Sequence, residues 1–193
     1  MLALVAAGAV VAGGIGVPAE TPLTDPSGAV RITELSLYVK LIACGVGAVL
    51  LLMAWPSNAD ASGNRSVDYA TETGEYFGLA LFSLAGVFLV ASADDLILLF
   101  LGLELVSIPT YIMVAIARPL ARAQEAGVKY FFLGAMAAAV LLFGFSYLFG
   151  VTGTISISGM AGKFYAARAA GAGVFGAWEL LALVFVMGGL AFK

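Results

Sequence analysis

Long apolar runs alternate with short polar segments along the whole chain. A helix that crosses a bilayer needs about 20 mostly apolar residues. The apolar runs predict membrane-spanning helices near residues 1–18, 35–55, 76–93, 96–117, 127–150 and 175–193. The segments between them are rich in Pro, Gly, Ser and Asp, which is typical of turns. The pattern therefore predicts an all-α polytopic membrane protein with about six transmembrane helices.

The composition agrees with this fold class and limits the chemistry of the chain. The 193 residues are 62% hydrophobic and 11% charged, and the mean hydropathy is +1.06. There is no histidine, and Cys44 is the one cysteine. A histidine-ligated haem, a cysteine-ligated iron–sulfur cluster or a usual zinc site therefore cannot be built from this chain alone. We therefore expect no cofactor in this chain. Because the sequence has no basic tract, we also expect no nucleic-acid partner.

The polar segments predict which side of the membrane parts of the chain face and which residue caps one helix. Lys and Arg are slightly enriched in the segment "RPLARAQEAGVK", which favours a cytoplasmic position for it and for the N-terminus. In the tight turn "SADD", Ser92 or Asp94 is expected to cap the helix that follows. The first run lacks the basic region of a signal peptide, so it is interpreted as a span. The last run reaches Lys193 without a cap or polar tail, and we expect the helix to continue.

Glu104 lies inside the apolar run "LLFLGLELVSIPTYIMV". It is about eight residues, or roughly 12 Å, into its predicted helix, near the middle of the hydrocarbon layer. An ionisable group at that depth costs about 2.5 to 3.5 kcal/mol, which the apolar residues around it offset at about 0.3 to 0.6 kcal/mol each. Ser107 and Tyr111 share its helix face, and Pro109 leaves the carbonyl of Leu105 without its usual donor. The residue is either a proton-handling group or a protonated glutamic acid that joins helices.

Two lysines are the other candidate groups. Lys193 is fifteen residues past Trp178, so it should lie about 22 Å into the layer if its helix continues, and it would be a terminal charge otherwise. Lys129 follows Glu125 at i+4 near a helix start, which fits a helix-surface pair or a snorkelling side chain as well as a buried role.

A carboxyl and a lysine inside the membrane can control each other's protonation. Removal from water favours the neutral form of both groups, whereas contact between them favours the charged forms. At about 4 Å and an effective dielectric near 20 their attraction is about 4 kcal/mol, or roughly three pKa units. Forming or breaking such a contact is the chemistry of a proton relay.

The stretches "EYFGLALFSLAGVFLVASADDLILLFLGLELVSIPTYIMVA" and "EAGVKYFFLGAMAAAVLLFGFSYLFGVTGT" resemble a known family. They look like the antiporter-like subunits of the proton-pumping NADH-quinone oxidoreductase, respiratory complex I, and in particular subunit N, subunit 2 in mitochondria. The similarity runs from about residue 75 to 193, whereas residues 1–74 match only in hydropathy. "LGLELVSIP" and "EAGVKYFFLGA" are the specific motifs.

The resemblance implies roles for the three charged residues. Glu104 matches the family's glutamate on the fifth helix, Lys193 the lysine on the broken seventh helix, and Lys129 a lysine at the start of the sixth. Glu104 and Lys193 would form the pair that couples conformation to proton transfer, and Lys129 would line the same hydrophilic axis. The expected site is therefore Glu104, Lys129 and Lys193, with no metal and no cofactor-binding residue.

The resemblance also implies an organisation and partners. Residues 1–74 would hold two transmembrane helices with polar loops, and residues 75–193 the helices of the first of two inverted repeats, truncated at the C-terminus. The protein would be a multi-pass subunit in a bacterial cytoplasmic (inner) membrane, among the other membrane subunits and the lipid bilayer. NADH, FMN, iron–sulfur clusters and quinone would bind in partner subunits. A stand-alone Mrp-type cation/proton antiporter subunit and a helical scaffold without an ion path are the alternatives.

Overall fold

The computed structural model describes residues 2–14, 23–24, 28–53, 73–116, 121–170 and 176–193. These residues form a small antiparallel hairpin and otherwise almost only helices. The elements are α1 (Leu2–Gly14), β1 (Leu23–Thr24), β2 (Arg31–Ile32), α2 (Glu34–Met53), α3 (Thr73–Ser92), α4 (Leu96–Ile116), α5 (Ala121–Thr152), α6 (Ile157–Ala169) and α7 (Ala177–Phe192).

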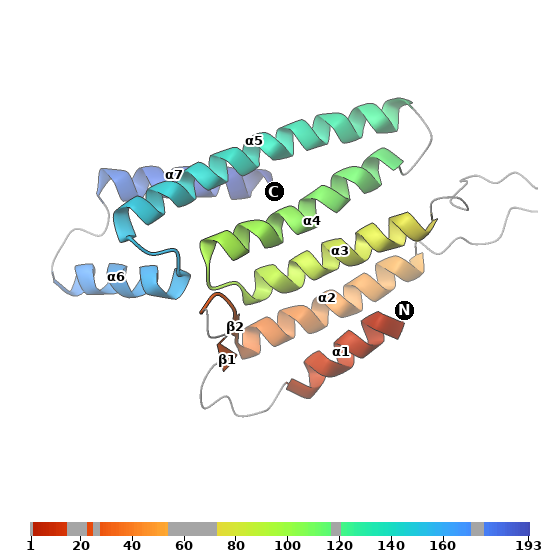
Figure 1. The fold of residues 1–193 in the computed structure, drawn as a ribbon, viewed down its shortest axis with the longest axis horizontal. Coiled ribbons are helices and arrows are strands. Elements are labelled where there is room, and N and C mark those ends of the chain that lie inside the picture. The colour runs from red at the N-terminus through yellow and green to blue at the C-terminus, as the bar shows by residue number, and fades with distance from the viewer. Residues whose placement is uncertain (1, 15–22, 25–27, 54–72, 117–120, 171–175) are drawn as a thin grey trace, which may run out of the picture.

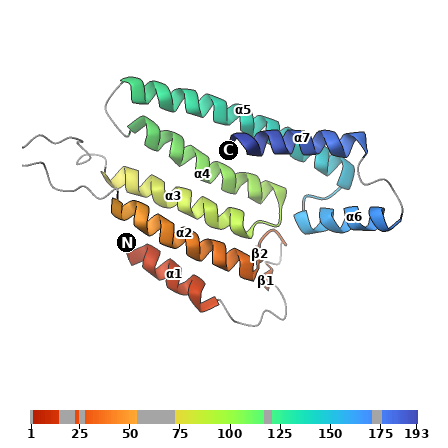
Figure 2. The ribbon, with the colours of Figure 1, turned by 180° about the vertical axis from the view of Figure 1, so that it is seen from behind.

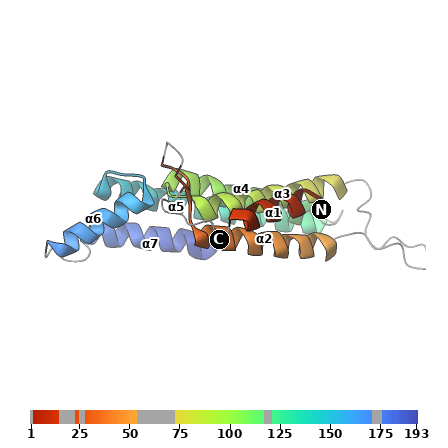
Figure 3. The same cartoon turned by 90° about the horizontal axis from the view of Figure 1, so that it is seen from below.

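Helices α1 to α5 lie side by side in chain order, as Figures 1 and 2 show from opposite sides. Seen from below in Figure 3, α7 and α2 lie on one side of the layer that contains α3 and α4. Helix α6 lies at one end of the row, and the C-terminal end of α7 reaches the middle of α4 (Figure 1). The fold thus brings the last described residue beside the centre of the bundle.

Each of the six predicted spans contains a helix. Among the described residues, α2, α3, α4 and α5 are long and apolar enough to cross a membrane, whereas α7 is a shorter apolar helix of 16 residues and α1 has 13. The predicted ends at 15–18, 54–55, 117 and 175 lie outside the described residues. Helix α5 begins at Ala121, before the predicted residue 127, because the charged segment ahead of the apolar run also adopts a helix.

Two elements are absent from the sequence prediction, namely the hairpin and α6. Neither contains a run of about 20 apolar residues, so a search for spans passes over both. The signal for α6 is Ser156, whose hydroxyl accepts a hydrogen bond from the amide of Gly159 at 3.1 Å, as an N-cap does. At the end of α5, Gly153 has a φ of +64°, and the ammonium of Lys163 donates to the carbonyl of Thr152.

The turn between α3 and α4 corrects the predicted cap. Asp95, and not Ser92 or Asp94, caps α4, since its Oδ1 accepts from the amides of Ile97 at 2.7 Å and Leu98 at 3.2 Å. The backbone around Asp94 is extended and pairs with Ala29 and Ile157, which turns the Asp94 carboxylate toward α6. There it accepts from the amide and the hydroxyl of Ser158, at 3.1 and 2.5 Å. The hairpin, this turn and α6 therefore meet at one end of the bundle.

Small residues let the helices pack closely, and in the segment "GAMAAA" of α5 Gly134, Ala137 and Ala138 are buried. A cluster of buried apolar side chains joins α4, α5 and α6 and contains Leu96, Leu141, Phe145 and Met160.

Candidate functional site

The ammonium of Lys193 lies 2.5 Å from Oε1 of Glu104, between residues 89 positions apart in the chain. The exposed fraction is 7% for the lysine side chain and 20% for the glutamate side chain. Glu104 comes from the middle of α4, and Lys193 follows the last turn of α7. The predicted partners of a carboxylate–lysine pair thus lie together, near the middle of α4.

Helix α3 fixes the stretch of α4 that carries Glu104. A Cβ atom on Gly86 would lie 2.7 Å from the amide nitrogen of Val106, and one on Gly102 would lie 2.8 Å from Val90 Cγ2. The two backbones approach as closely as glycine permits, since real Cβ contacts are longer. The hydroxyl of Ser83 on α3 also donates to the carbonyl of Val106 at 3.3 Å. The backbone on both sides of Glu104 is therefore held in place.

Helix α5 places the other partner. A Cβ atom on Gly189 of α7 would meet the backbone of Leu141 at 2.9 Å, and one on Gly144 of α5 would meet the backbone of Val186 at 2.8 Å. Leu141 is fully buried in this contact. Because Lys193 comes one turn after Gly189, the close packing of α7 on α5 sets where the lysine side chain begins.

The structure does not bring Lys129 to this pair. Its ammonium lies 2.5 Å from Oε1 of Glu125, one turn earlier on α5, and the two side chains are 70% and 64% exposed. The buried face of α5 near this point contains Gly127 and Gly134, which meet α4. Lys129 therefore lies on a different face of α5 from the one that packs on the helix of Glu104.

The two residues predicted to share the helix face of Glu104 have different neighbours in the structure. Ser107 belongs to the pair, because its Oγ lies 3.2 Å from the ammonium of Lys193. Tyr111 is buried against α5 instead, with its ring centroid 4.6 Å from that of Tyr130. Helix α4 continues through Pro109. The hydroxyl of the next residue, Thr110, donates a hydrogen bond to the carbonyl of Val106 at 2.6 Å. Ser83 is the contributor to this region that sequence reasoning missed, since nothing in its apolar run marks it.

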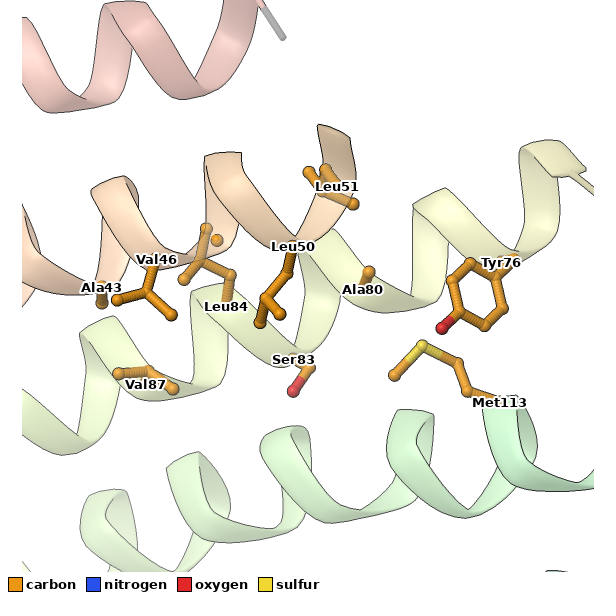
Figure 4. A pocket seen from close by; sticks show the side chains of 11 residues that line it. Ala43, Val46, Leu50, Leu51, Tyr76, Ala80, Ser83, Leu84, Val87 and Met113 are labelled. Carbon is orange, nitrogen blue, oxygen red and sulfur yellow. The ribbon is translucent and has the colours of Figure 1, made fainter. Parts of the chain in front are cut away.

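An apolar pocket of about 400 Å³ lies between α2 and α3, with Met113 of α4 at one side (Figure 4). Aliphatic side chains such as Val46, Leu50 and Val87 line it, and Ser83 and Tyr76 add hydroxyl groups. Its lining contains no charged residue and neither member of the Glu104 pair. The pocket is therefore separate from the charged site. Within the described parts of the chain, no cluster of three or more His, Cys, Asp or Glu residues could hold a metal ion.

Comparison with known proteins confirms the predicted resemblance. The model of a family described as NADH:quinone oxidoreductase/Mrp antiporter, TM, matches residues 93–193. The chain is 44% identical over 120 residues to NADH-quinone oxidoreductase subunit N of Nitrosomonas europaea, covering 62% of this chain and 24% of that protein. It is 37% identical over 193 residues to the subunit N of Azorhizobium caulinodans, covering 99% of this chain and 36% of the relative.

A solved structure agrees with the sequence relatives. The chain superposes on a chain of respiratory complex I from Thermus thermophilus with a TM-score of 0.70 and 28% identity, over 98% of this chain and 36% of the other. The apolar helices, the antiporter-like fold and the bacterial relatives confirm the predicted class and location, a helical integral protein of the bacterial inner membrane. The chain spans only 24% to 36% of the length of the relatives described above.

Proposed function

Because the chain belongs to the NADH:quinone oxidoreductase/Mrp antiporter transmembrane family, we propose that it is part of a membrane subunit that moves protons in an NADH:quinone oxidoreductase. The observation that carries the proposal is the contact of Glu104 with Lys193 across α4 and α7. Electron transfer from NADH to quinone would take place in other subunits. NADH, FMN, iron–sulfur clusters and quinone would bind there, and the neighbouring membrane subunits and lipid would surround this chain.

The pair would work by alternating between two states, one in which the two side chains touch and are charged, and one in which they are apart and neutral. While the ammonium of Lys193 touches the Glu104 carboxylate, each charge stabilises the other. When the two separate, the apolar surroundings favour the neutral form of both, so Glu104 takes up a proton from one side and Lys193 releases its own to the other. Renewed contact favours ionisation again, and the proton that Glu104 took up passes to Lys193, which returns the pair to its first state. One opening and closing therefore moves protons without any redox group in this chain.

The rigid packing around Glu104 indicates which partner moves. Its backbone is held by Gly86 and Ser83 of α3, whereas the ammonium of Lys193 reaches it on a long flexible side chain. We propose that Lys193 changes position while Glu104 stays in place.

Lys129 is proposed as a further group on the same proton axis, on the basis of the family motif "EAGVKYFFLGA". Its contact with Glu125 is exposed in the described residues. The two-part organisation, with residues 1–74 ahead of a first antiporter-like repeat in 75–193, is likewise a proposal. Since the family description also covers Mrp antiporters, a stand-alone cation/proton antiporter subunit is the alternative.

Proton pumping in vesicles that contain the complete protein in its complex tests this function. Glu104→Gln and Lys193→Ala should each lower the number of protons moved per NADH oxidised by at least tenfold, and Lys129→Ala should lower it by less. Glu75→Gln, which removes an exposed carboxylate at the first turn of α3, is the control and should have no effect. Normal pumping in both Glu104→Gln and Lys193→Ala would contradict the proposal. Pumping that depends on sodium and not on NADH would favour the antiporter alternative.

A further inference from the structure

Lys193 has a second acceptor besides Glu104, which is the hydroxyl of Ser107. The ammonium nitrogen lies 3.2 Å from Ser107 Oγ, one turn after the glutamate on the same face of α4. The same Oγ lies 2.7 Å from the carbonyl of Leu103 and donates its hydrogen there. A serine hydroxyl has one hydrogen and two lone pairs. With the hydrogen used for the backbone, what Ser107 presents to Lys193 is an acceptor.

We propose that Ser107 is a positioning residue that keeps the amine of Lys193 near Glu104 after their contact opens, while the carboxyl is protonated. This inference rests on the proposed function. When Glu104 takes up a proton it loses its negative charge, and the ionic attraction to Lys193 disappears. The hydrogen bond to Ser107 does not depend on that charge. It keeps the amine within reach, so that contact with the glutamate can form again.

Ser107 suits this role because its hydroxyl is held in one position on α4. Its back-bond to Leu103 ties the hydroxyl to the turn of α4 that includes Glu104. The same turn is held against α3 through Gly102. The backbone that carries Glu104 and Ser107 is therefore held in place, and the lysine is the group that moves between states.

Thr110 provides a matched control on the same helix. Its hydroxyl also bonds the carbonyl four residues earlier, that of Val106, at 2.6 Å. Within the described residues, however, Lys193 bonds Ser107 and Glu104 and not Thr110. Removing either hydroxyl takes away a back-bond from α4, and only removal of the Ser107 hydroxyl takes away an acceptor from Lys193.

The experiment measures protons moved per NADH oxidised by the complete complex in vesicles, with NADH oxidation as the measure of assembly. Ser107→Ala should lower the ratio by about two- to tenfold, the value of one hydrogen bond. Ser107→Thr, which retains the hydroxyl, should restore it, and Thr110→Ala should leave it unchanged. If Ser107→Ala fails to assemble, Ser107→Cys provides a similar volume with a weak acceptor and should show the same loss.

The outcomes separate this inference from the function on which it rests. A normal ratio in Ser107→Ala, or an equal loss in Thr110→Ala, overturns the positioning role while Glu104→Gln and Lys193→Ala still abolish pumping. A loss in Ser107→Ala that Ser107→Thr does not repair also overturns it, since the hydroxyl is then not what matters. Normal pumping in Glu104→Gln and Lys193→Ala would instead remove the proposed function itself.

Discussion

The chain contains two carboxylate–lysine contacts of the same length, 2.5 Å, in very different surroundings. Glu104 and Lys193 belong to different helices and are largely buried, with 20% and 7% of their side chains exposed. Glu125 and Lys129 are neighbours on one helix and are 64% and 70% exposed. Distance alone therefore does not distinguish a proposed proton switch from a helix-surface pair.

The difference lies in what happens when each contact opens. An exposed i, i+4 pair contributes about 0.3 to 0.5 kcal/mol, because water and ions solvate both charges once they separate. At a buried pair no water or ion takes the place of the lost partner, and removal of one partner leaves an uncompensated charge that costs about 3 to 5 kcal/mol. Separating the two side chains would therefore cost far more at the buried pair than at the exposed one.

The largest effect is expected on stability, when the glutamate of each pair is replaced. Glu104→Gln removes the countercharge of Lys193 and should lower the free energy of unfolding by about 3 kcal/mol. Glu125→Gln should lower it by no more than about 0.5 kcal/mol. Denaturant unfolding of the complete protein in detergent micelles measures both. Equal losses in the two variants would show that the burial of the first pair has no energetic consequence.

A smaller effect is expected from two adjacent glycines on α7. A Cβ at Gly189 would meet the backbone of Leu141, whereas Gly188 faces open space within the described residues. Gly189→Ala should therefore push α7 from α5, lower the free energy of unfolding by about 1 to 3 kcal/mol and displace Lys193 from Glu104. Gly188→Ala is the control and should change stability by less than about 0.5 kcal/mol. Matching unfolding curves for the two variants would argue against α5 as the support of Lys193.

The sequence predicts the helices well because a bilayer imposes one simple requirement, an apolar run of a fixed length. It also places Glu104 near the middle of α4, and the family motif assigns it Lys193 as a partner. The cap of α4 by Asp95 could not be assigned, since which of two adjacent aspartates faces the helix depends on the extended pairing of the turn with Ala29 and Ile157. Ser107 contacts Lys193 whereas Tyr111 packs on α5. This difference depends on how α3, α5 and α7 pack around α4, which the helix pattern alone does not predict.

The protonation of Glu104 tests the central claim most directly. Infrared difference spectra of the complete complex, recorded before and after NADH is added, detect the carbonyl stretch of a carboxylic acid that forms or disappears during turnover. The account predicts a carboxyl signal that is absent in Glu104→Gln, altered in Lys193→Ala and unaffected in Glu125→Gln. A signal identical in all four proteins, wild type included, would show that Glu104 does not change protonation and would contradict the account.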